Sequence, residues 1–171
     1  MTFDATLLMN LGRVFAHESG HAIMATLKQI PYCGIAYNKD EQLFCTLTHI
    51  TVVPTQHTPD HYLYFAAGVA AERMLFAQDE ESEGGKDDRK FFESVCAPDF
   101  EITVTQAQAI LSARKNTIEY LVARLKATVK GIRFDFDPLE EVVVDGRKCA
   151  ILLSERDLKS AIDSSEKSAS D

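Results

Sequence analysis

The chain has 171 residues, of which 46% are hydrophobic and 26% charged, so it is long enough to fold as one domain around a single core. Its formal net charge is −8 at pH 7 and its pI is near 5.1. This acidic balance, with no Lys/Arg run longer than two residues, excludes the basic surface that binding to nucleic acid or an anionic membrane needs.

The first predicted element is a long helix from about Thr6 to Lys28, which ends before Pro31. Gly20 lies inside this helix, where a glycine costs roughly 1 kcal/mol relative to alanine. A glycine at such a position indicates close approach by another element of the fold.

An H-E-x-x-H motif, residues 17 to 21, occupies the middle of this helix. His17 and His21 are four residues apart and project from the same face, so they can occupy two corners of a zinc tetrahedron. Glu18 is rotated about 100° from His17, which lets its carboxylate address a metal-bound water without being a ligand. Because short motifs also occur by chance, the alternative is two ordinary helix histidines and a surface glutamate.

Two predicted strands follow, Ile35–Tyr37 and Leu43–Val53, joined by a polar turn into a hairpin. Pro54 closes the second strand. Its edge is a candidate for holding an extended peptide beside the metal, since main-chain hydrogen bonds to a sheet edge are a common way to bind one. The alternative is an ordinary strand covered on both sides.

A second helix is predicted from Pro59 to Ala77, because Thr58 supplies a hydroxyl cap and the proline stands at the first helical position. It is apolar on nearly every face, so we expect it to be the central buried helix. Glu72 lies within that apolar surface, where a carboxylate is costly unless it is paired or hydrogen-bonded.

The acidic, glycine-containing segment 78–86 is predicted to be a loop, and Asp87-Asp88 to open a third helix that ends before Pro98. The clearest amphipathic pattern runs from Thr105 to about Lys130. Its apolar stripe consists of Ile118, Leu121, Val122, Leu125 and Val129.

A second hairpin is predicted at residues 142–147, where Asp-Gly favours a tight turn, and Ser154 is predicted to cap a short last helix. Residues 164–171 are poor in hydrophobic residues, so we expect them to be a disordered tail after a single domain of residues 1–163. The expected fold class is α+β and mostly α-helical, with a small sheet beside the helix that carries the motif.

Three segments, in order, carry a family resemblance: VFAHESGHAI at 14–23, AAGVAAERMLF at 66–76 and SEGGKDD at 82–88. They resemble V-A-x-H-E-A-G-H-A, L-A-G-R-A-A-E-E-L-I-F and S-T-G-A-S-N-D of the peptidase domain of FtsH-type zinc metallopeptidases. The likeness covers roughly residues 10 to 130. It implies an H-E-x-x-H zinc-metallopeptidase fold with Zn²⁺ as its cofactor.

The resemblance also implies the remaining site residues. It places Asp88 as the third zinc ligand beside His17 and His21, with Asp87 as its cap or a supporting neighbour. A shift of one residue would give the ligand role to Asp87, and both could be plain helix N-terminal acids. For Glu72 the likeness implies a hydrogen bond to the free ring nitrogen of a zinc-bound histidine. The alternative is pairing with a nearby Arg or Lys.

The chain departs from that family in lacking a G-x-x-x-x-G-K-[ST] phosphate loop, so the expectation is a peptidase domain standing alone. No apolar run approaches the 18 residues of a membrane span, whereas FtsH-type proteins are usually membrane-anchored. The predicted function is a zinc-dependent endopeptidase with Glu18 as general base, acting on unfolded or flexible polypeptide. The alternative is a catalytically silent protein-binding module. A separate ATPase in trans and a homo-oligomer are both compatible with either.

The remaining candidate residues receive no role. The cysteines Cys33, Cys45, Cys96 and Cys149 are far apart without a C-x-x-C pair, which is typical of a reducing compartment. With no basic residue before Arg13, the amino terminus does not resemble a secretory signal, so a cytoplasmic protein is expected. The other three histidines, His49, His57 and His61, are interpreted as ordinary surface or core residues.

Overall fold

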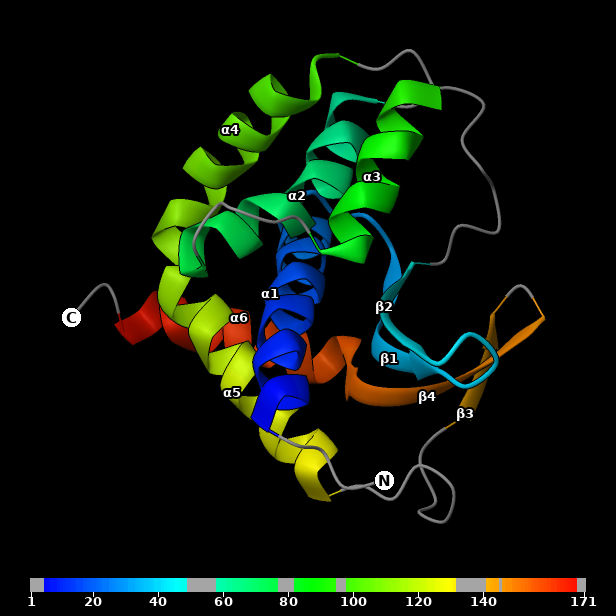
Figure 1. Ribbon diagram of the computed structural model, residues 1–171. Helices are drawn as coiled ribbons and strands as arrows, with labels where there is room; N and C mark the ends of the chain where they lie inside the picture. The colour runs from blue at the N-terminus through cyan, green and yellow to red at the C-terminus, as the bar shows by residue number, and fades with distance from the viewer. Residues whose placement is uncertain are drawn as a thin grey trace.

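The computed structural model describes residues 5–48, 58–76, 82–94, 98–131, 141–144 and 146–168 (Figure 1). Within these ranges the elements are α1 (Ala5–Leu27), β1 (Tyr32–Asn38), β2 (Leu43–Thr48), α2 (Pro59–Leu75), α3 (Glu83–Ser94), α4 (Phe100–Leu111), η1 (a 3₁₀ turn, Ser112–Arg114), α5 (Lys115–Gly131), β3 (Glu141–Val144), β4 (Arg147–Ser154) and α6 (Glu155–Ser168). No helix among them is long and apolar enough to cross a bilayer.

The four strands form one antiparallel sheet in the order β2-β1-β4-β3. Both predicted hairpins are present, although residues 49–54, the predicted end of the second strand and the proline after it, lie outside the described part of the chain. The second hairpin turns at Gly146, whose φ of +80° suits a residue without a side chain. The pairing of β1 with β4 joins the two hairpins into a single sheet. The α+β class predicted from the sequence, mostly helical with a small sheet, is therefore confirmed.

Helix α1 lies at the centre of the fold, in contact with every other described helix and with β1 and β2 (Figure 1). Phe15 and Ile23 on this helix are completely buried. We predicted that the second helix would be central. Helix α2 is buried along its middle, but it packs chiefly against α1 and α4 and does not contact the sheet as α1 does. A side chain at Gly20 would place its Cβ 2.3 Å from the carbonyl oxygen of Ala67, which explains the glycine at the α1–α2 contact.

Two predicted helix boundaries are wrong. Helix α3 begins at Glu83, four residues before Asp87, and residues 77–81 lie outside the described part of the chain. The single amphipathic helix predicted for 105–130 is divided by η1 into α4 and α5. This division lets α4 pack on α2 while α5, with its predicted apolar stripe fully in the core, packs on α1.

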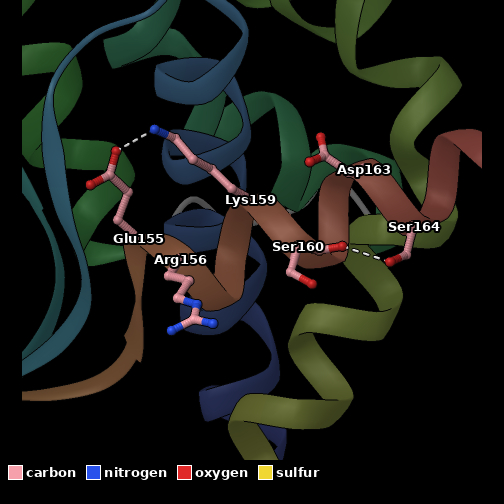
Figure 2. A pocket seen from close by; sticks show the side chains of 6 residues that line it. All are labelled: Glu155, Arg156, Lys159, Ser160, Asp163 and Ser164. Carbon is pink, nitrogen blue, oxygen red and sulfur yellow. Dashed lines mark hydrogen bonds and ion pairs between the residues drawn. The ribbon is translucent and has the colours of Figure 1, made fainter.

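Helix α6 starts as predicted, with a reciprocal cap between Ser154 and Asp157: each backbone N–H is donated to the other's side-chain oxygen. The helix continues to Ser168, so the disorder predicted from Ser164 is wrong for residues 164–168, while 169–171 lie outside the described residues. A shallow hollow follows α6 (Figure 2), and its lining side chains all come from this helix.

Candidate metal centre

Both histidines of the motif are buried on α1, and each is held by one ring nitrogen. Nδ1 of His21 lies 2.8 Å from the carbonyl oxygen of Tyr64, and Nδ1 of His17 lies 2.7 Å from Oε1 of Glu72. A carbonyl and a carboxylate only accept hydrogen bonds, so both Nδ1 atoms donate. In the neutral imidazoles, Nε2 of each ring therefore carries an unshared electron pair.

Helix α3 brings Asp88 to these two nitrogens. Its Oδ2 lies 3.4 Å from Nε2 of His17 and 3.3 Å from Nε2 of His21, and the two Nε2 atoms are 2.9 Å apart. Among the described residues, no group donates a hydrogen bond to this buried oxygen. Three electron-pair donors that face one another out of water need a cation between or beside them.

The spacing of the three atoms suits a small tetrahedral metal ion. Bonds of 2.0–2.1 Å at tetrahedral angles place neighbouring ligand atoms about 3.3–3.4 Å apart. Two of the three separations match this value and the third is shorter by a few tenths of an ångström. The group His17, His21 and Asp88 is the one set of His, Cys, Asp and Glu side chains in the described residues with metal-ligand spacing.

Glu72 supports the first of these histidines from α2. The residue is 4% exposed, and its carboxylate accepts hydrogen bonds from Nδ1 of His17 and from the backbone N–H and hydroxyl of Ser82. The nitrogen Nε of Arg13 lies 3.9 Å away. The structure thus places Glu72 against the imidazole, the first of the two alternatives for it, with an arginine as a more distant neighbour.

Asp87 does not take part in this cluster. Its side chain is 74% exposed and pairs with Lys90, one turn further along α3. Because α3 begins at Glu83, Asp87 is the fifth helical residue and cannot be its cap. The predicted role as a cap or a supporting neighbour of Asp88 is wrong.

Two glycines make room for the imidazole of His17. A Cβ on Gly68 of α2 would lie 2.4 Å from its Cε1, and a Cβ on Gly84 of α3 would lie 3.0 Å from its Nε2. Real Cβ atoms do not approach another atom as closely as 2.4 Å, so the ring occupies space that only glycine leaves open at position 68, while a Cβ at position 84 would be tight.

Replacing Gly68 by Ala is therefore expected to displace the ring of His17 and to lower zinc affinity at least about tenfold, because ligand distances are tolerated only within about 0.2 Å. Gly12→Ala is the matched control, since its added Cβ would come too close only to the flexible end of Lys126 and would otherwise touch Cζ of Phe76 at 3.5 Å, an ordinary van der Waals distance. Zinc titration of both variants checks the prediction. Equal affinity of Gly68→Ala and the wild type would contradict it.

The electrostatics of the cluster also favour a positive charge. Burial by itself lowers the pKa of His17, but the hydrogen bond with Glu72 and the negative charges of Asp88 and Glu18 outweigh it and raise the pKa from 6.5 to about 9. The imidazole of the metal-free protein therefore holds a proton at neutral pH, where a metal would otherwise sit.

A pH dependence follows from this raised pKa. The metal needs the neutral ring, so zinc affinity should rise with pH between about 6.5 and 9, and zinc binding at pH 7.5 should release a proton from His17. The stability that this proton contributes to the metal-free protein is complete below pH 6.5 and lost as pH rises through 9. Calorimetric titrations in buffers of different ionisation enthalpy measure the released proton; no release at pH 7.5 would contradict the prediction.

Glu18 is almost buried and points to strand β2. Its Oε2 accepts from the backbone N–H of Thr46 at 2.6 Å and lies 2.8 Å from the Thr46 hydroxyl, which is also 2.9 Å from the carbonyl oxygen of Glu18. At this point, the outer edge of β2 is therefore occupied by the motif helix. The free edge that we considered for peptide binding is closed at Thr46.

Three further residues contact the site that the sequence did not assign to it: Thr46, Tyr64 through its carbonyl, and Ser82. Of these, only Ser82 lies in a segment that resembles the peptidase family, as the first residue of the third such segment. Of the other histidines, His61 lies in the capping box of α2, and His49 and His57 lie outside the described residues.

No protein-family model, curated protein or solved structure matches the chain. Two imidazole nitrogens and one carboxylate oxygen can hold a divalent ion. A second carboxylate, that of Glu18, is outside this ligand set and belongs to the residue that follows His17 on the same helix.

Proposed function

We propose that this chain is a zinc-dependent metallopeptidase that cleaves unfolded or flexible polypeptide. The observation that supports it most is the buried triangle of Nε2 of His17, Nε2 of His21 and Oδ2 of Asp88. Three protein ligands of this kind are typical of catalytic zinc, where the fourth position is left to water.

The same donors are also found around iron(II) in oxygenases. Glu18 favours zinc hydrolysis over that chemistry, because a carboxylate beside two histidines is the arrangement that removes a proton from a metal-bound water. The three segments that resemble FtsH-type peptidases, each of which supplies a residue of this cluster or of its support, favour a peptide bond as the target.

Each residue has a distinct task in the proposed reaction. A zinc ion held by His17, His21 and Asp88 would lower the pKa of a bound water and polarise the substrate carbonyl. Glu18 would accept a proton from the attacking water and pass it to the leaving amine. Glu72 keeps the proton of His17 on Nδ1 and so directs Nε2 to the metal.

The proposed substrate class takes account of these 171 residues alone. They contain no phosphate loop and therefore do not themselves supply ATP-driven unfolding of a stable protein. Its substrates are then segments that are already extended, such as flexible termini, unfolded chains or peptides.

Removal of the metal tests the proposal. The purified full chain should cleave an unfolded protein such as reduced casein, lose this activity in 1,10-phenanthroline and regain it when zinc is added back. ATP should leave the rate unchanged. Cleavage that continues at the same rate after the metal has been removed would contradict a metallopeptidase.

A further inference from the structure

Thr46 on β2 binds one oxygen of Glu18 with two donors. Its backbone N–H and its hydroxyl both point to Oε2, at 2.6 and 2.8 Å. The described residues give Oε1 no hydrogen bond. The two oxygens of this carboxylate therefore have different surroundings: Oε2 is bound by the strand, whereas Oε1 has no hydrogen bond from the described residues.

The sheet holds Thr46, and with it both donors, in a fixed position. Thr46 pairs with Ile35 of β1, and β1 is held on its other side by β4. The single hydrogen of the hydroxyl lies within reach of both Oε2 and the carbonyl oxygen of Glu18 and is shared between them, while the backbone N–H of Thr46 binds Oε2 alone. A glutamate with three rotatable bonds loses most of its freedom in such a contact.

We propose that Thr46 is a positioning residue, which orients Glu18 by binding Oε2 and leaves Oε1 to accept the proton in the reaction. This inference rests on the proposed function, since it assigns Thr46 a task within that mechanism. Thr46 acts through Glu18, and no metal ligand is in hydrogen-bond contact with it. A peptide cannot pair with the N–H of Thr46 while Glu18 holds it.

The test uses Thr46→Val, which removes the hydroxyl and keeps the shape, and Thr46→Ser, which keeps the hydroxyl. In zinc-loaded full-length protein, Thr46→Val should lower kcat about tenfold, the typical effect of one hydrogen bond to a charged group. KM and zinc stoichiometry should stay within about twofold of wild type. Thr46→Ser should restore most of kcat.

A second readout needs neither metal nor turnover. The amide proton of Thr46 should resonate downfield in the wild type, as expected for a hydrogen bond to a carboxylate, and move upfield in Glu18→Gln. The amide of Cys45, which pairs with Ala36 of β1, is the control and should shift little.

The outcomes separate this proposal from the function on which it rests. If the wild type is active and kcat is unchanged in Thr46→Val, or if the chemical shift of the Thr46 amide proton does not change in Glu18→Gln, Thr46 has no positioning role. Either result leaves the proposed peptidase activity unaffected. Equal activity losses in Thr46→Val and Thr46→Ser overturn the role of the hydroxyl. An inactive zinc-loaded wild type refutes the peptidase, while the amide shift still decides the contact.

Discussion

Replacing Glu18 by Gln is expected to lower kcat/KM for unfolded polypeptide at least 100-fold while the protein keeps its zinc. The amide has nearly the shape of the carboxylate but cannot take a proton from water, and loss of a general base typically costs 10²–10⁴-fold. Cleavage of fluorescently labelled casein gives the rate. Elemental analysis of the same sample gives the zinc content.

The matched control is Glu83→Gln on α3, where the same charge is removed from a side chain that is 85% exposed. Its rate should stay within about twofold of wild type. A Glu18→Gln variant as active as the wild type would remove Glu18 from the mechanism. A wild type that binds zinc fully and cleaves nothing would favour the alternative, a protein-binding module that has lost turnover.

Removing a proposed ligand should have the largest effect on metal binding. His17→Ala and His21→Ala are each expected to weaken zinc binding by more than about 100-fold, because loss of a direct ligand exceeds the 10–100-fold cost of losing a supporting contact. Competition with a chromophoric chelator measures the affinity. Zinc that stays at one ion per chain in both variants would contradict the site.

The two neighbouring aspartates give a sharper comparison. Asp88→Ala and Asp87→Ala remove the same group from consecutive residues of α3, but only Asp88 faces the two histidines, whereas Asp87 faces Lys90. Asp88→Ala should weaken zinc binding strongly and Asp87→Ala little. The opposite order would move the ligand to Asp87.

The features predictable from sequence are those that a few consecutive residues determine. The spacing of His17 and His21 places them on one face of α1, Thr58 and Pro59 begin α2, and Gly146 lies at the turn of the second hairpin. Burial of Glu72 in an apolar surface indicated that it had a partner, because a lone carboxylate there would be costly.

Contacts between distant segments could not be predicted in the same way. His21 is held by the backbone carbonyl of Tyr64, and any residue at that position offers the same carbonyl. The contact between Glu18 and Thr46 depends on which edge of β2 meets α1, and the sequence of the strand does not specify this. The pairing of β1 with β4 likewise joins two hairpins that each look complete alone.

The predicted start of α3 also differs from the structure. Segment 83–86 contains two glycines, which are typical of a loop, yet α3 begins at Glu83. Gly85 is buried, and Gly84 lies against the ring of His17. Close packing at the cluster outweighs the low helix propensity of glycine, about 1 kcal/mol for each residue. This early start sets Asp87 and Asp88 one turn into the helix.

X-ray absorption at the zinc edge, on the purified and zinc-loaded full chain, tests most directly whether His17, His21 and Asp88 form a catalytic zinc centre. We expect one zinc per chain with about four nitrogen and oxygen ligands at 2.0–2.2 Å, two of them imidazoles. A sulfur shell near 2.3 Å, which would place the metal on the cysteines, or the absence of bound zinc would contradict it.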